Sequence, residues 1–297
     1  MNRAVEAGYQ PGSTVKPLII LAGLSEKDRR TGLPLITERT IFHCPSSEFS
    51  RPSCVYSHGS VGPFDAVKHS CNVYSATVAQ KLGSSLLVWF NDFGLTHRAS
   101  LSLPREYNSA LSGLVSDRFG VLPSLQAWEA RQFAIGQGRL TVTPLQVANM
   151  MATLARRGVY IPPSLNIKRN QIDEPTHLDF DPRAMDLVLR ALEAVVNESG
   201  GTAYGVSELR SLGIRVAGKT GTAEYKPDLN DWRCWFSGFA PADNLQIAFS
   251  VVIEHGSFGA QAAAPVAADL LRECIKHGYI KSSSSAGMSL PSVSPPG

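Results

Sequence analysis

Apolar residues recur every three or four positions between Met185 and Val196, which is the period of a helix with one buried face. Asp181 and Pro182 come directly before this stretch, and that order is typical of an N-cap followed by proline at the first helical position. A glycine pair at 200–201 closes the pattern. The spacing therefore predicts a helix from Pro182 to the glycine pair.

A second apolar stripe begins after Thr143 and ends at Gly158. A glutamine three residues after Thr143 is placed to complete a capping box at the start of this helix. Two shorter helices are expected over 64–69 and 72–82. Ser70 would then lie at the junction of two packed helices.

The period changes to strand-like alternation from Gly213 onward. A first strand leads into residues 219–222, and further strands are predicted over 234–239 and 245–254. Because the links between them are short, the strands should form an antiparallel meander. A last helix is expected over 265–278.

The length and composition support one large domain over 1–280 and a Ser/Pro-rich tail over 281–297. The tail is poor in apolar residues, so burial cannot repay the entropy of ordering it, and we expect it to be disordered. The 28 basic and 25 acidic residues are scattered, so the formal charge of +3 indicates no nucleic-acid surface. Apolar runs fall far short of the ~20 residues of a membrane helix, and no signal peptide follows Met1.

Five cysteines leave at least one outside any intramolecular pair. Cys44 and Cys54 enclose a short polar loop, and a disulfide between them would add roughly 3 kcal/mol by restricting the unfolded chain. His43 and His58 flank the same cysteines, but their spacing matches no common zinc finger, so we expect no metal and no cofactor. Two reduced thiols are the alternative to the disulfide.

Two short motifs point to acyl transfer by a serine. Ser13 and Lys16 have the S-x-x-K spacing, which places the hydroxyl beside the ammonium on one face of a helix. Ser13 would sit at the helix N-terminus, where unpaired N–H groups favour developing negative charge. Lys16 can act as the base if burial or a second cation lowers its pKa, and Lys219 is the expected cation.

The second motif, K-T-G-T, comprises Lys219, Thr220, Gly221 and Thr222. Gly221 has no side chain, so an extended substrate could pair with the strand edge there. The N–H groups of Thr222 and Ser13 are expected to form an oxyanion hole. The Lys219 ammonium and the two threonine hydroxyls are expected to bind a substrate carboxylate. The alternative is that Ser13 only caps a helix and Lys219 is a solvated strand residue.

A third motif, Ser-x-Asn, occurs as Ser70 with Asn72 and as Ser164 with Asn166. The second copy follows two prolines in an expected surface loop, so we favour the first. The Ser70 hydroxyl could pass a proton between Lys16 and the reacting amine, and the Asn72 amide could orient the scissile peptide. A helix cap at Ser70 is the structural alternative.

With these three motifs in this order, the chain resembles the transpeptidase domain of class B penicillin-binding proteins, and within them the elongation type called penicillin-binding protein 2. The resemblance covers roughly residues 2–278 and is carried by 2–17, 58–83, 134–158, 196–206, 214–225 and 234–256. It implies an α+β fold in which an antiparallel sheet is flanked by helices, with an all-helical subdomain.

The resemblance also implies the role of each motif. Ser13 would be the acylated nucleophile, Lys16 its base, Ser70 and Asn72 the second motif, and Lys219 to Thr222 the third. The substrates would be the D-Ala-D-Ala stems of peptidoglycan, with the acyl group passed to an amine of a neighbouring stem. β-Lactams would acylate the same serine, and the expected setting is the periplasm beside the cell-wall elongation machinery.

Family members carry a membrane anchor, a pedestal and the opening strands of the sheet before the nucleophile, whereas Met1 stands twelve residues before Ser13. The strand over 245–254 would then have an uncovered apolar edge, so we expect a fragment or a sheet completed by another chain. Cys44 and Cys54 also resemble a pair in some relatives, which favours the disulfide. A D,D-carboxypeptidase or β-lactamase-like hydrolase, and a truncated non-catalytic binding module, are the competing hypotheses.

Overall fold

The computed structural model describes residues 1–45, 52–99, 105–109, 111, 124–165, 174–226, 231–256 and 259–281. Its main sheet is an antiparallel meander of β5 (Ala217–Lys226), β6 (Asp231–Ala240) and β7 (Ile247–Gly256) in that spatial order. The predicted meander is therefore confirmed, although the first strand begins later than Gly213. Gly221 of β5 lies opposite Trp235 of β6 in the register.

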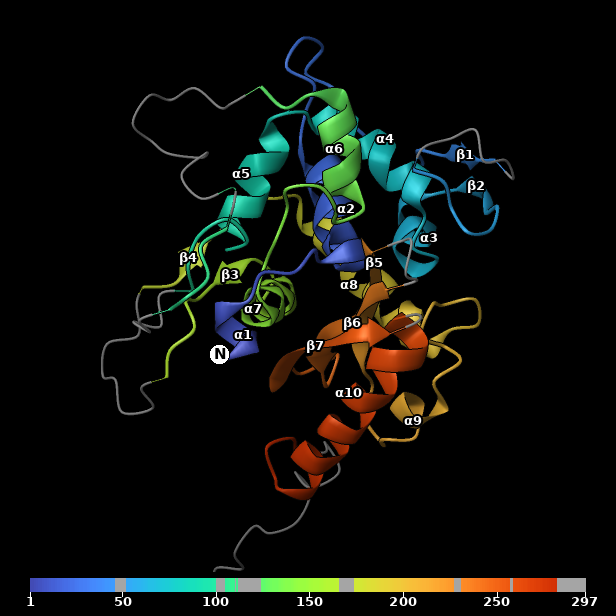
Figure 1. Ribbon diagram of the computed structural model, residues 1–297. Coiled ribbons are helices and arrows are strands. Elements are labelled where there is room, and N and C mark those ends of the chain that lie inside the picture. The colour runs from blue at the N-terminus through green and yellow to red at the C-terminus, as the bar shows by residue number, and fades with distance from the viewer. Residues whose placement is uncertain are drawn as a thin grey trace, which may run out of the picture.

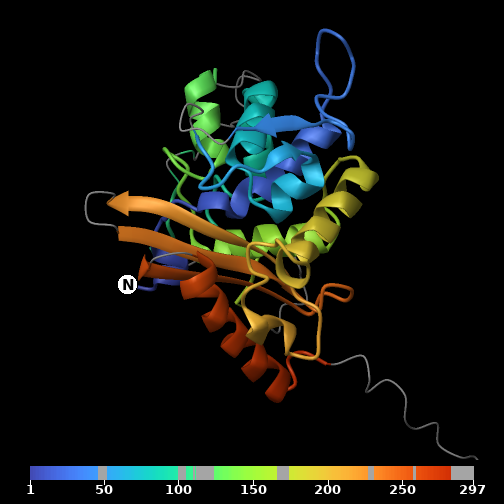
Figure 2. The ribbon, with the colours of Figure 1, turned by 90° about the vertical axis from the view of Figure 1, so that its right-hand side faces the viewer.

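Alternation along β6 sends neighbouring side chains to opposite faces of the sheet. Trp235 and Phe239 join the larger core on one face of the sheet. Phe236 and Ala240 pack on the opposite face, which α10 (Gly259–Lys276) covers. Figure 2 shows α10 along one face of the strands and most other helices on the opposite face. The sheet is thus covered on both faces, which fixes the strand β5 that carries residues 219–222 of the site.

The helices with clear start signals form as predicted. In α7 (Pro144–Ala155), Thr143 and Gln146 make the reciprocal bonds of a capping box. Asp181 caps α8 (Pro182–Asn197) by accepting a hydrogen bond from the Arg183 N–H at 2.8 Å. The α3 (Pro63–Lys68) and α4 (Asn72–Leu82) helices flank Ser70, as the sequence indicated.

Other elements differ from the prediction. The last helix begins at Gly259, and Pro265 lies inside it, because an alanine-rich stretch before the proline already favours helix. The sequence did not predict α1 (Arg3–Glu6), α5 (Ser85–Asp92), α6 (Ala127–Ala134), α9 (Ser207–Arg210) or two small sheets, β1 (Phe42–Cys44) with β2 (Gly59–Val61) and β3 (Val159–Tyr160) with β4 (Thr176–His177). Figure 1 places the β1/β2 sheet beside α3 and α4. Asn166 and the tail from 282 to 297 lie outside the described residues.

Within the described residues, β7 pairs with β6 and with no strand on its other side. Most of its side chains are half-buried, and Phe249 alone is fully buried. The sequence expectation of an open edge therefore holds for this part of the chain. None of the described helices combines the length and apolar character needed to cross a membrane.

Candidate active site

Ser13, the expected nucleophile, lies in a tight turn that contains Gly12 and packs against Gly221 of β5. Ser13 belongs to the 3₁₀ helix η1 (Gly12–Val15), which leads into α2 (Lys16–Ser25). The sequence predicted an α-helix here, whereas Ser13 lies in a 3₁₀ turn whose last bond runs from the Lys16 backbone N–H to the Ser13 carbonyl. The proximity of the Ser13 hydroxyl to the Lys16 ammonium stays a prediction. Ser13 is half-buried, and within the described part of the chain its hydroxyl makes no hydrogen bond. Its oxygen is therefore not held by another side chain.

Lys16 contacts both named residues of the second motif. Its side chain is fully buried, and its Nζ donates to the Ser70 carbonyl at 2.6 Å, the Ser70 hydroxyl at 3.2 Å and the Asn72 side-chain oxygen at 2.5 Å. Burial removes water from the ammonium and lowers the pKa of Lys16 to about 8. A neutral amine suited to accept a proton is thus accessible near neutral pH.

The second motif is held in a special backbone conformation. Ser70 has a φ of 59°, in the left-handed region, where it connects α3 to α4. Asn72 donates from its side-chain amide to the Ser53 carbonyl at 2.6 Å and from its backbone N–H to the Cys54 sulfur at 3.1 Å. Both ends of the Asn72 amide are therefore engaged, one by Ser53 and the other by Lys16. The sequence did not predict Ser53, because no local signal links it to Asn72.

Lys219 and Lys16 lie close enough for their charges to interact. The interaction lowers the pKa of Lys219, whereas the sequence suggested that Lys219 would lower the pKa of Lys16. Lys219 is fully buried and donates to the Thr220 carbonyl at 3.0 Å. Burial first, and then the positive charge of Lys16, hold the pKa of Lys219 well below its ordinary value. Burial, rather than the charge of Lys219, is what lowers the pKa of Lys16. A carboxylate entering this site would favour the charged form of Lys219 again.

Two glycines bring the nucleophile turn against β5. A Cβ on Gly221 would lie 2.9 Å from the Pro11 carbonyl oxygen and 3.0 Å from Thr14 Cγ2. Gly12 has a φ of +57°, and a Cβ there would lie 3.0 Å from the backbone of Thr222. The bare Cα of Gly221 therefore faces the Ser13 turn, whereas the sequence interpretation gave that space to a substrate. This close packing places the first and third motifs side by side.

The threonines of the third motif have partners that the sequence did not predict. The Thr220 hydroxyl lies 2.7 Å from the Thr202 hydroxyl, in the segment after α8. The Thr222 hydroxyl accepts a hydrogen bond from the Gly259 N–H at 3.2 Å, at the first residue of α10. Thr202 thus contacts one of the hydroxyls that the sequence predicted to bind a substrate carboxylate.

A group of metal-ligating side chains adjoins the second motif. The donor atoms of Cys44, Cys54, His58 and Cys71 all lie within 4.8 Å of one another. Three thiols and one imidazole are a donor set that suits tetrahedral zinc, so these residues could hold such an ion. The sequence considered zinc with His43 and His58 and set it aside, yet His43 is exposed on β1 and outside the group. Cys71, between Ser70 and Asn72, is the candidate ligand that the spacing did not reveal.

Of the two alternatives left open for Cys44 and Cys54, the structure has the reduced one, since all five cysteines are free. Cys54 instead lies at the N-terminus of α4, where its sulfur is 3.8 Å from that of Cys71 and accepts the Asn72 N–H. The contact with the Cys71 thiol lowers the pKa of Cys54 to about 4. The Cys44 sulfur lies 3.5 Å from His58 Nδ1.

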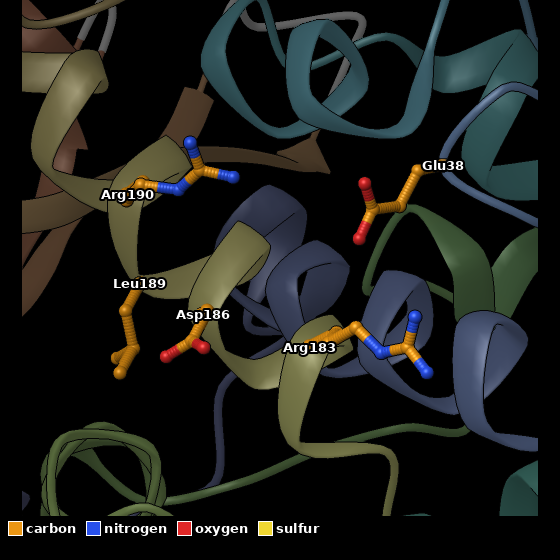
Figure 3. Close-up of a pocket in the computed structure, with 5 residues that line it drawn as sticks. All are labelled: Glu38, Arg183, Asp186, Leu189 and Arg190. Atoms are coloured by element: carbon orange, nitrogen blue, oxygen red, sulfur yellow. The ribbon is translucent and has the colours of Figure 1, made fainter.

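Two surface hollows of the described residues lie away from the three motifs. One of 420 Å³ on the N-terminal half of α8 is lined by Glu38, Arg183, Asp186, Leu189 and Arg190, whose side chains Figure 3 shows. None of these residues belongs to the three motifs. The candidate active site is therefore defined by its polar contacts and not by this hollow.

The chain is similar over most of its length to known proteins. The profile of the penicillin binding protein transpeptidase domain matches residues 1–272. The chain is 30% identical over 292 residues to the peptidoglycan D,D-transpeptidase MrdA of Acinetobacter baumannii, covering 88% of this chain and 42% of that protein. It is 30% identical over 277 residues to the peptidoglycan D,D-transpeptidase FtsI of Escherichia coli K12, covering 89% and 43%. The chain thus spans less than half the length of these relatives.

Solved structures show the same fold. The structure of Pseudomonas aeruginosa PBP2 in complex with WCK 5153 superposes with a TM-score of 0.78 at 29% identity, covering 97% of this chain and 66% of that one. The complex of PBP2 and MreC from Helicobacter pylori gives a TM-score of 0.79 at 25% identity, covering 94% and 52%. The chain belongs to the penicillin-binding protein transpeptidase family, as a domain of the PBP2 type.

Proposed function

We propose that this domain is a peptidoglycan D,D-transpeptidase that works through an acyl-enzyme on Ser13. The observation that carries the proposal is the buried Lys16 ammonium in contact with both Ser70 and Asn72. S-x-x-K with K-T-G is a motif set of serine acyl transferases that bind penicillin. Relatives that carry the name D,D-transpeptidase support the same reaction class.

The proposed chemistry begins with neutral Lys16. Its amine takes the Ser13 proton as the serine oxygen attacks the penultimate D-Ala carbonyl of a stem peptide. Ser70, whose hydroxyl lies 3.2 Å from Lys16 Nζ, passes that proton to the nitrogen of the departing D-Ala. An amine of a neighbouring stem then attacks the ester, its proton returns along the same path, and Ser13 is released.

The third motif would bind the substrate and stabilise charge. The N–H groups of Ser13 and Thr222 would stabilise the oxyanion, and the packing of Gly12 against Thr222 supports their proximity. The terminal carboxylate of the stem would lie on Lys219, Thr220 and Thr222. Its negative charge would raise the pKa of Lys219 and restore the ammonium. β-Lactams carry a similar carboxylate and would acylate the same serine.

A hydrolase with this nucleophile is the second candidate, and the site offers less for it. The charged groups that act most on the pKa of Lys16 are the thiols Cys54, Cys71 and Cys44, and not carboxylates. Within the described residues, no carboxylate bonds to Lys16 or Ser70. Among the described residues, no acidic side chain is therefore bonded to these two groups to activate a water there, which favours transfer to an amine.

We extend the proposal to setting and partners. The domain would act on the extracytoplasmic face of the inner membrane, together with the cell-wall elongation machinery. The MrdA relative and the PBP2–MreC complex from Helicobacter pylori support this extension. A pull-down from membranes of the source cells, with cell-wall synthesis proteins enriched on the full-length protein, would test it.

The reaction itself is tested by incubating the chain with a D-Ala-D-Ala pentapeptide donor and an amine acceptor. We expect released D-Ala and a cross-linked product, both absent in Ser13→Ala. A Ser13-dependent product that is only the hydrolysed donor would support the carboxypeptidase. A chain that binds penicillin without a covalent adduct would support the non-catalytic module.

A further inference from the structure

Ser70, the proposed proton relay, has a backbone conformation that needs support from its surroundings. Its φ of 59° lies in the left-handed region, which a residue other than glycine seldom adopts. The backbone N–H of Ser70 donates to the Val67 carbonyl at 3.2 Å, which ties the junction between the two helices to α3. The position of the Ser70 hydroxyl therefore depends on what else holds this junction.

The His69 side chain ties the same junction to a second segment. Its Nδ1 lies 2.9 Å from the Gly200 carbonyl oxygen, in the chain that follows α8. Because a carbonyl oxygen only accepts hydrogen bonds, Nδ1 carries the hydrogen, which the neutral Nδ1–H tautomer and the imidazolium both provide. Gly200 has a φ of +82°, and a Cβ there would lie 3.1 Å from His69 Cε1. The absence of a side chain at Gly200 therefore lets the imidazole approach.

The segment 198–202 also contacts both motifs at other points. Lys68 Nζ lies 2.8 Å from the Glu198 carboxylate, and only 13% of the Lys68 side chain is exposed. At the other end of the segment, the Thr202 hydroxyl lies 2.7 Å from that of Thr220. The segment therefore connects the end of α3, which precedes the second motif, with the third motif on β5.

We propose that His69 is a positioning residue of the reaction, and that its hydrogen bond to Gly200 holds the Ser70 hydroxyl within reach of Lys16. Ser70 Oγ lies 3.2 Å from Lys16 Nζ, and proton transfer to the leaving nitrogen requires that this contact be kept. Without the Nδ1 hydrogen the junction can shift, and a misplacement of about 1 Å can slow a reaction about 100-fold. The inference rests on the proposed function, because it assigns His69 to the same proton transfer.

His69 also stacks on His58, with ring centroids 5.9 Å apart, and that contact offers a competing explanation of any effect. Two variants separate the hydrogen bond from the stacking. His69→Phe keeps a flat ring and loses the donor, whereas His69→Asn keeps an N–H donor close to the backbone and loses the ring. His277→Phe, at an exposed position after α10, is the matched control.

The test is stopped-flow labelling by fluorescent penicillin over a range of concentrations, which gives the limiting acylation rate and the concentration for half-saturation. In His69→Phe we expect a limiting rate about 10- to 100-fold below that of the wild type with unchanged half-saturation, because the proton relay is disturbed and binding is not. His69→Asn should recover most of the rate, and His277→Phe should match the wild type. Full rate in His69→Phe, a loss confined to half-saturation, or no recovery in His69→Asn would overturn the proposal.

A crystal structure of His69→Phe tests the positioning without any turnover. We expect Ser70 Oγ to lie beyond hydrogen-bond distance of Lys16 Nζ in a chain that keeps its fold. A Ser70 that retains its φ of 59° and its 3.2 Å contact would refute the role of His69. If the wild type fails to label, the proposed function fails, and the structure still decides whether His69 sets the position of Ser70.

Discussion

Lys16 donates from its Nζ to the side-chain oxygen of Asn72 at 2.5 Å, across 56 positions of sequence. The bond joins the first turn of α2 to the start of α4 and leaves the amine fully buried. Because Ser70 Oγ lies 3.2 Å from the same amine, one group connects the expected nucleophile region with the expected proton relay.

Replacing Lys16 should abolish the proposed chemistry while leaving most of the packing. In Lys16→Met the side chain keeps its length and loses the amine, so acylation by penicillin should fall about 10²- to 10⁴-fold. Stopped-flow labelling measures the rate, and circular dichroism checks the fold. Lys81→Met, at an exposed position of α4, is the matched control and should label like the wild type. Equal rates in both variants would remove Lys16 from the mechanism.

Acylation should depend on pH through Lys16. Its pKa is lowered to about 8 because burial disfavours the ammonium, and the base must be neutral to accept a proton. The rate should therefore be low in acid, rise with pH and reach half its maximum near pH 8. A labelling rate measured across this range that falls with rising pH would contradict neutral Lys16 as the base.

Gly221→Ala should destabilise the domain and displace Ser13. The added methyl would meet the Pro11 carbonyl oxygen at 2.9 Å and Trp235 Cβ at 3.1 Å, so the turn and the strand must separate. We expect a loss of about 1–3 kcal/mol in the free energy of unfolding by urea, typical of overpacking. Gly205→Ala provides the control, since a Cβ there meets nothing within 4 Å. Equal stability of the two variants would show that Gly221 does not hold this contact.

How much of this could be foreseen depends on whether the signal is local. The capping residues Thr143 and Asp181 marked their helices, because a cap acts within one turn. The three motifs likewise identified Lys16, Ser70 and Asn72, which the fold brings into contact. The contact between Cys54 and Cys71 could not be foreseen in the same way, because it depends on how the loop before β2 packs on α4. The lowered pKa values of Lys16 and Lys219 likewise depend on burial, which spacing does not report.

Zinc should bind the four-residue group and stabilise the fold. A metal that binds only the folded chain adds about 2.7 kcal/mol at a hundred times its Kd, so the melting temperature should rise with zinc and fall with EDTA. Cobalt in place of zinc would report thiolate ligation by its absorption spectrum. Cys71→Ser should weaken both signals and Cys274→Ser should change neither. Unaltered melting with zinc would exclude the site.

The central claim is that Ser13 becomes covalently acylated because Lys16 activates it. Its most direct test is mass spectrometry of peptides from penicillin-treated chain, comparing the wild type with folded Lys16→Met. We expect a penicilloyl adduct on the peptide that contains Ser13 in the wild type and little or none in the variant over the same time. An adduct on another residue, or equal modification of Ser13 in both chains, would contradict it.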